Sequence, residues 1–183
     1  MKNNRIIGMV CAVIVYLLSL LAASLPGFLS PYLWTASPVV AALLCAFSYV
    51  WLARRWRGPG LSAALSLVFA VFLLAFGEVD MRTAVLMVMV GVLSDVARRF
   101  FGSESDKSLF RAYPILALVP VVRFLPLWAD VQAYYEGAVE EMGQDYAHVI
   151  FSLSTPWMDV AVVLCTLLAG VAGVRLAAKL WKS

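Results

Sequence analysis

Six apolar segments separated by short polar ones dominate this chain and restrict what it can fold into. They lie at about residues 6–25, 38–53, 60–77, 83–97, 109–127 and 157–178. A helix of roughly 17–25 residues crosses the ~30 Å hydrocarbon core of a bilayer, so the shorter segments need flanking residues or a tilt. Of the 183 residues, 63% are hydrophobic and 14% charged, which is not the composition of a soluble domain. We therefore predict a single integral membrane domain over 1–183, an all-α six-transmembrane-helix bundle embedded in the lipid bilayer.

Basic residues gather on one side of the predicted spans. The N-terminus, the connections after spans two and four, and the C-terminus hold Lys2, Arg5, Arg54, Arg55, Arg57, Arg98, Arg99, Lys107, Arg111, Arg175, Lys179 and Lys182. The other side holds Arg82, Arg123, Glu78, Asp80, Asp130, Glu136, Glu140, Glu141 and Asp145. The positive-inside rule then predicts cytoplasmic N- and C-termini for a multi-pass protein of the inner or plasma membrane. The net charge of +3 reflects this topology, and we expect no nucleic-acid partner.

Span five differs from the others in its prolines. Pro114, Pro120 and Pro126 follow one another at intervals of six residues. Because a proline inside a helix removes a backbone hydrogen bond, we expect this span to be kinked or discontinuous. Broken helices line binding sites in transporters, although a kinked helix can also serve packing alone.

The segment from Trp128 to Ala147 follows a helical period. One stripe at spacings of three and four consists of Val131, Tyr135, Ala138, Val139, Met142 and Tyr146. We predict an external amphipathic helix between spans five and six, unless Gly143 interrupts it. Glu136 and Glu140 fall on the opposite, solvated face. Glu141 and Asp145 fall on the shoulder of the stripe with Tyr134, where a cavity is within reach.

Arg123 lies in the outer half of span five, where an unpaired cation is costly. It either forms an ion pair with Glu141, Asp145 or Glu78, or receives a carboxylate from a ligand. Aromatic side chains on the same side act as interfacial anchors or wall a pocket for a planar or amphipathic ligand. With them, the candidate ligand-binding residues are Trp34, Arg123, Trp128, Tyr134, Glu141, Asp145, Tyr146 and Trp157.

The adjacent Glu140 and Glu141 also resemble part of the EExxxR motif of intramembrane CAAX-type proteases. The fourth residue after Glu141 is Asp145, however, and the chain has a single histidine, His148, so the ligands for a catalytic metal are missing. The sequence also has no Gly-rich phosphate loop and no nucleophile with a partnered base. We predict neither catalytic residues nor a metal site or cofactor.

Gly8 and Ala12 in span one are small residues four positions apart. This spacing lets helix backbones approach closely, and it makes the two residues candidates for docking a partner protein.

Two stretches, PLWADVQAYYEGAVEEMGQDYAHVIFSLSTPWM at 126–158 and GVLSDVARRFFG at 91–102, resemble the Trep_Strep group of substrate-binding S components of energy-coupling factor (ECF) transporters. The resemblance implies a subunit that captures a micronutrient outside the cell. It would dock through spans one to three, with Gly8 and Ala12, on a transmembrane coupling protein powered by two ATPase subunits. It also implies a small-molecule cargo that is vitamin-like, iron-related or haem-like. His148, near the tyrosines, is compatible with such a cargo and completes the candidate ligand-binding set.

Three other functions compete with this one. A self-sufficient secondary carrier needs ionisable residues near the membrane midplane, whereas the charges here lie near span ends. An intramembrane enzyme lacks its ligands, as argued above. A purely structural membrane protein is the remaining alternative.

Overall fold

The computed structural model describes residues 2–56, 60–102 and 106–181, in which every regular element is a helix and none is a strand. This confirms the predicted all-α class. In chain order the elements are α1 (Lys2–Ser24), the 3-10 helix η1 (Leu25–Phe28), α2 (Pro31–Arg55), α3 (Leu61–Ala75), α4 (Met81–Phe100), α5 (Asp106–Leu116), α6 (Val119–Val122), α7 (Leu125–Ala129), α8 (Val131–Met142), α9 (Gln144–Leu153) and α10 (Pro156–Leu180).

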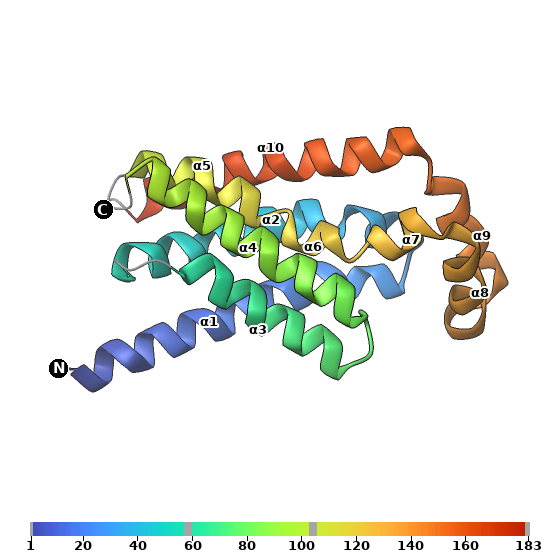
Figure 1. Cartoon of the computed structure of the whole chain (residues 1–183), viewed down its shortest axis with the longest axis horizontal. Helices are drawn as coiled ribbons and strands as arrows, with labels where there is room; N and C mark the ends of the chain where they lie inside the picture. The colour runs from blue at the N-terminus through green and yellow to red at the C-terminus, as the bar shows by residue number, and fades with distance from the viewer. Residues whose placement is uncertain (1, 57–59, 103–105, 182–183) are drawn as a thin grey trace.

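The long helices run side by side along one axis, and α8 and α9 lie at one end of the bundle (Figure 1). We call α8 and α9 the cap, and this end the cap end. The opposite, terminal end is where α1 begins and α10 ends (Figure 1). The chain runs back and forth between the two ends through α1, α2, α3, α4, the broken segment α5–α7, and α10. Helix α10 packs against α2 and α5, α1 against α2, and α3 against α4.

Three helical stretches of the described chain are long and apolar enough to cross a membrane: Ile7–Phe28, Pro31–Arg55 and Pro156–Leu180. Helix α3 is apolar but has only 15 residues. Helix α4 has 20 residues, but its last two turns contain Asp95, Arg98 and Arg99. The predicted second span began at residue 38, whereas α2 begins at Pro31, because Ser30 adopts the extended conformation of a helix N-cap (φ −158°, ψ 132°). Pro38 is then accommodated inside the helix.

The predicted break in span five is confirmed. Helices α5, α6 and α7 are separated at residues 117–118 and 123–124. Pro120 and Pro126 occupy the first turns of α6 and α7, where a missing N–H costs nothing. At the second break, the N–H of Phe124 bonds the carbonyl of Val121 at 2.9 Å, a three-residue spacing that tightens the turn.

The prediction of a single helix between spans five and six is wrong, because this segment forms two helices. Gly143, with φ 88° and ψ 163°, divides the segment into α8 and α9. Such a backbone conformation is accessible to glycine at little cost and ends α8 at Met142.

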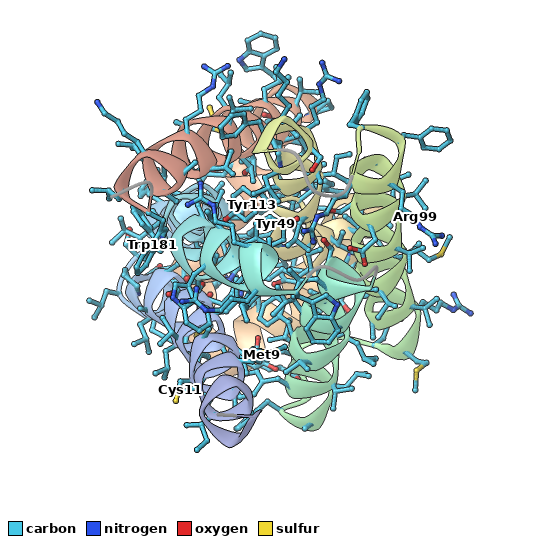
Figure 2. All side chains as sticks on the ribbon, turned by 90° about the vertical axis from the view of Figure 1, so that its left-hand side faces the viewer. Met9, Cys11, Tyr49, Arg99, Tyr113 and Trp181 are labelled. Carbon is cyan, nitrogen blue, oxygen red and sulfur yellow. The ribbon has the colours of Figure 1, made fainter. Side chains whose placement is uncertain are left out.

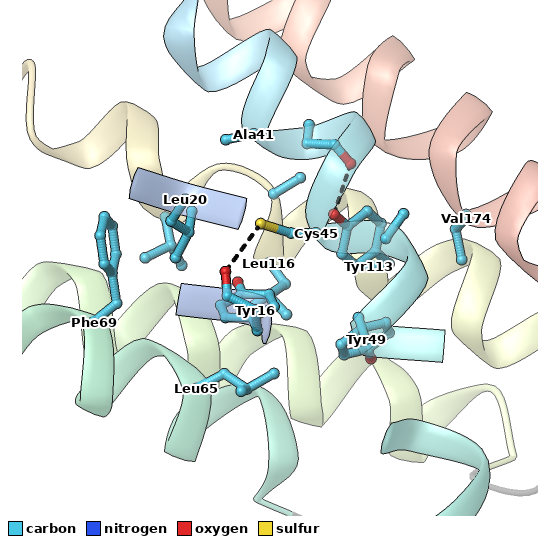
Figure 3. Close-up of a cluster of buried hydrophobic side chains, with 14 of the residues drawn as sticks. Tyr16, Leu20, Ala41, Cys45, Tyr49, Leu65, Phe69, Tyr113, Leu116 and Val174 are labelled. Atoms are coloured by element: carbon cyan, nitrogen blue, oxygen red, sulfur yellow. Dashed lines mark hydrogen bonds between the residues drawn. The ribbon is translucent and has the colours of Figure 1, made fainter. Parts of the chain in front are cut away.

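The main core lies inside the bundle and combines apolar and aromatic side chains from α1, α2, α3, α5 and α10 (Figure 3). The Tyr113 hydroxyl donates to the carbonyl oxygen of Ala42 at 2.6 Å, and the Cys45 thiol to that of Tyr16 at 3.7 Å (Figure 3). A Cβ added at Gly173 would lie 3.0 Å from the Ala42 oxygen, so glycine here permits the close contact of α10 with α2.

A group of buried polar side chains joins α3 and α4 near the terminal end. The Asp95 carboxylate accepts hydrogen bonds from the backbone N–H groups of Ser62 (3.0 Å) and Ala63 (2.9 Å) in the first turn of α3. The buried Arg98 donates to the carbonyl oxygen of Ala53 in α2 at 2.8 Å. In the view onto the terminal end, Tyr49 and Tyr113 lie near the centre of the bundle and Arg99 at its periphery (Figure 2). The two buried charges therefore fasten neighbouring helices, whereas Arg99 points to the surroundings.

Candidate functional site

Arg123 follows α6 at the second break of the broken segment. It is the C-cap residue of α6, and its neighbours Val122 and Phe124 are buried. The Arg123 side chain itself is partly buried. The break thus places a cation among apolar side chains in the half of the bundle that leads to the cap end.

The partners of Arg123 are weak ones. Its Nη1 donates a single long hydrogen bond, 3.4 Å, to the Ser24 hydroxyl. Its Cζ lies 5.4 Å from the ring centroids of both Trp34 and Phe124, at the outer range of a cation–π contact. Among the described residues, no carboxylate oxygen lies within the 4.0 Å of an ion pair with Arg123. The predicted ion pair of Arg123 with Glu141, Asp145 or Glu78 is therefore not present in the structure.

Aromatic rings extend from Arg123 toward the cap. Trp34 meets Phe124 edge-on, with 4.3 Å between ring centroids, and lies 6.2 Å from Tyr134. Phe124 stacks on Trp128 at 6.2 Å. A Cβ added at Gly27 would lie 3.0–3.1 Å from Trp34, so only glycine lets η1 approach this ring without displacement. We call Ser24, Trp34, Arg123, Phe124 and Tyr134 the Arg123 site.

Two tyrosines of the cap take part in this arrangement. Burial raises the pKa of Tyr134 to about 12; the positive charge of Arg123 opposes this rise, and the charges of Glu78 and Glu141 add to it. The phenol is therefore neutral at physiological pH. The hydroxyl of Tyr146 donates to the carbonyl oxygen of Gly27. Burial also raises the pKa of Tyr146, again opposed by Arg123.

A pocket adjoins the Arg123 site. We call it the Trp34–Trp128 pocket, and it is lined by Trp34, Thr35, Phe124, Leu127, Trp128, Ile150, Leu153, Ser154, Met158, Asp159 and Val162. Its cavity volume of about 20 Å³ is room for roughly one water molecule. A molecule larger than water therefore fits only when the side chains or the cap move.

The structure divides the predicted ligand-binding residues into two groups. Trp34, Trp128, Arg123, Tyr134 and Tyr146 come together around the site and its pocket. The side chains of Glu141, Asp145 and His148 are exposed on the cap, and Trp157 is 81% exposed at the start of α10. None of these four lines the Trp34–Trp128 pocket.

Sequence patterns missed several residues that build the site. Phe124 contributes a ring to both Arg123 and the pocket, and Ser24 and Gly27 supply the polar contacts from the end of α1 and from η1. Phe124 was detectable as the aromatic neighbour of Arg123. Ser24 and Gly27 carry no comparable signal, because they lie about a hundred residues from their partners in the chain.

The candidate docking residues Gly8 and Ala12 lie on the inner side of α1. A Cβ at Gly8 would lie 3.2 Å from the Trp51 ring of α2, and Ala12 packs against the core. The exposed side of α1 instead presents Ile7, Val10, Ile14, Val15 and Leu18.

A family model described as "Hypothetical bacterial integral membrane protein (Trep_Strep)" matches residues 5–183. No curated protein and no solved structure matches the chain.

Proposed function

This chain belongs to the Trep_Strep family of bacterial integral membrane proteins, and from that membership we propose that it is the substrate-capture subunit of an ATP-driven ECF-type importer. It binds a small micronutrient at the external face of the inner or plasma membrane. It binds and releases the cargo chemically unchanged.

The proposed topology has six spans with both termini in the cytoplasm. Support comes from the back-and-forth course of the chain, which brings the start of α1 and the end of α10 to one end (Figure 1). Several basic residues, among them Arg99, Arg175 and Lys179, lie in the last turns of α4 and α10 at this end. The positive-inside rule assigns such an end to the cytoplasm and the cap end to the outside.

The observation that carries the proposal is the Arg123 site. A partly buried guanidinium lies next to an aromatic wall, under a cap whose helix α8 has no buried residue. An ionisable residue within a spanning segment is a functional-site hypothesis by default, because its burial is costly. A site close to the external end and covered by a separable pair of helices suits capture from outside.

Transport energy comes from partners in this proposal. A transmembrane coupling protein docks on the first three spans, and two ATPase subunits drive release of the cargo to the cytoplasm. Because Gly8 and Ala12 face inward, the docking surface includes the exposed apolar side of α1 beside them. The two small residues contribute by holding α1 close to α2.

The alternative of a self-sufficient secondary carrier is less favoured. The buried charges Asp95 and Arg98 both bond backbone groups of neighbouring helices. Groups held in this way fix the bundle and are poorly placed to bind and release a coupling ion.

Purification of the tagged chain from its native membrane in a mild detergent tests the dependence on partners. We expect a transmembrane coupling protein and two ATPase subunits to co-purify and to be identified by mass spectrometry. A variant with Ile7, Val10 and Ile14 replaced by Ser should lose them, whereas Leu164→Ser on the exposed side of α10 should not. Purification of the wild-type chain free of any ATPase would contradict the proposal.

A further inference from the structure

We propose that the cargo is an organic anion, whose carboxylate pairs with Arg123 and whose apolar, aromatic body lies against Trp34 and Phe124. This inference rests on the proposed function, because it names the chemical class of the captured molecule. It follows from one charge, that of Arg123, which has no ion-pair partner in the part of the chain that the structure describes.

The protein occupies few of the hydrogen-bond donors of the Arg123 guanidinium. An arginine side chain offers five N–H donors in a planar fork that suits a carboxylate. Among the described residues, hydrogen bonding to Arg123 is limited to the 3.4 Å bond with Ser24. A partly buried cation with so few bonds is costly to keep, so it needs a reason other than the stability of the empty protein.

Among the described residues, the carboxylate of Glu78 acts on this charge electrostatically, but no carboxylate reaches ion-pair distance. The side chains of Glu78 and Glu141 are exposed, and neither forms an ion pair with Arg123 within the described chain. Tyr134 stays protonated, because its pKa is about 12. Tyr146 directs its proton to the Gly27 carbonyl. A ligand acid group is therefore the missing counter-charge.

The surroundings of Arg123 indicate the rest of the molecule. The rings of Trp34 and Phe124 contact the guanidinium and also line the Trp34–Trp128 pocket. A carboxylate on Arg123 thus places the attached group against these rings. Leu127, Trp128 and Ile150 continue the same apolar lining. Such walls favour a flat, apolar body, with the acid as the single polar anchor.

The pocket also contains a group of opposite charge, Asp159. A cationic cargo between two tryptophans and this carboxylate would be the competing chemistry. Asp159 has a sufficient structural reason, however: it lies in the first turn of α10, after the Thr155 cap, where the helix dipole stabilises a negative charge. Arg123 has no equivalent reason, so the charge of the cargo is assigned from Arg123.

The test uses the purified chain in detergent, without coupling partners, so that its outcome is independent of transport. Benzoate, indole-3-acetate and 2-naphthoate are each compared with their neutral primary amides, with the melting temperature measured at increasing ligand concentration. We expect at least one acid to bind about tenfold or more tightly than its amide. Arg123→Gln should remove this preference, and the matched control Arg82→Gln, at an exposed position in the first turn of α4 and outside the pocket, should keep it.

A second measurement separates a ligand role from a structural one. Without ligand, Arg123→Gln should melt at the wild-type temperature or above, since it removes a partly buried charge that forms no ion pair with any described residue. A clearly lower melting temperature would assign Arg123 to the fold and overturn the inference. Equal binding of acids and amides, or stabilisation by phosphatidylglycerol in place of the acids, would also overturn it. Such a result would leave the proposed function intact, because the co-purification experiment tests the dependence on coupling partners separately.

Discussion

The hydroxyl of Tyr146 in α9 donates a hydrogen bond to the carbonyl oxygen of Gly27 in η1, and so fastens the cap to the bundle beside the Arg123 site. Helix α8 contributes no buried residue, and α9 buries only Ala147 and Ile150. Much of the order of the cap therefore depends on this bond and on the small cluster around Leu127 and Ile150.

Tyr146→Phe should loosen the cap. The substitution keeps the ring and removes the bond to Gly27, at a cost of about 1 kcal/mol. Hydrogen exchange of the α9 amides should then become several-fold faster, while that of α2 stays unchanged. Tyr135→Phe serves as the control, because the Tyr135 ring packs against Phe151 at 5.6 Å and has no such bond among the described residues. Equal protection of α9 in wild type and Tyr146→Phe would contradict the assigned role.

Gly27→Ala should displace Trp34. The added Cβ would meet the Trp34 backbone and side chain at 3.0–3.1 Å, and overpacking of this kind costs about 1–3 kcal/mol. We expect a lower melting temperature and a changed Trp fluorescence spectrum. Gly137→Ala in α8 is the control, because a Cβ there meets nothing within 4 Å and alanine favours a helix. If Gly27→Ala is as stable as Gly137→Ala, the close contact with Trp34 is not required.

Asp95→Ala should weaken the bundle at its terminal end. It leaves the N–H groups of Ser62 and Ala63 without their acceptor, for which we expect a loss of about 1–3 kcal/mol. Thermal melting in detergent measures this. Asp80→Ala removes an N-cap bond to Thr83 at an exposed position and should cost less. A larger loss for Asp80→Ala than for Asp95→Ala would contradict the role of Asp95.

Ionisation of Tyr134 at high pH should lower the stability of the protein. Tyr134 has a pKa raised to about 12 by burial, from an ordinary value of 10.0. A raised pKa contributes stability that is fully present below pH 10 and is lost as the pH rises through about 12. Wild type should therefore lose stability between these values faster than Tyr134→Phe, as followed by thermal melting. Parallel pH profiles of the two proteins would show that the ring is not buried in solution.

Cysteine labelling tests the orientation of the bundle. In a variant whose Cys11, Cys45 and Cys165 are replaced by Ala, a new cysteine at Gly137 in the cap should react with an impermeant maleimide added to intact cells. One at Lys179, near the end of α10, should react only after permeabilisation. The reverse pattern would invert the assignment of the cap end to the outside.

Helix positions were largely predictable, because long apolar runs and regularly spaced prolines act locally. Pro120 and Pro126 mark the breaks that start α6 and α7, whereas Pro114 at the same spacing lies inside α5, and Gly143 marks where α8 ends. The start of α2 was missed, since Ser30-Pro31 and Ser37-Pro38 are equally good local signals and tertiary packing decides between them. Contacts between residues that lie far apart in the chain have no comparable local sequence signal.

The site was predictable only in part for the same reason. Position in the membrane and amino-acid type pointed to Arg123 and the aromatic residues around it. The choice among charged partners depended on how the cap sits on the bundle. Division of the cap at Gly143 leaves Glu141, Asp145 and His148 exposed, so helical periodicity over one continuous helix placed Glu141 and Asp145 nearer the site than they are.

Transport in reconstituted liposomes tests the proposed function most directly. The cargo that remains bound to the natively purified chain, identified by mass spectrometry, is added outside liposomes that contain either the chain alone or the chain with its coupling protein and two ATPases. We expect uptake only with all components and internal ATP, and none from the chain alone under a proton or sodium gradient. Gradient-driven uptake by the chain alone would contradict a capture subunit and establish a secondary carrier.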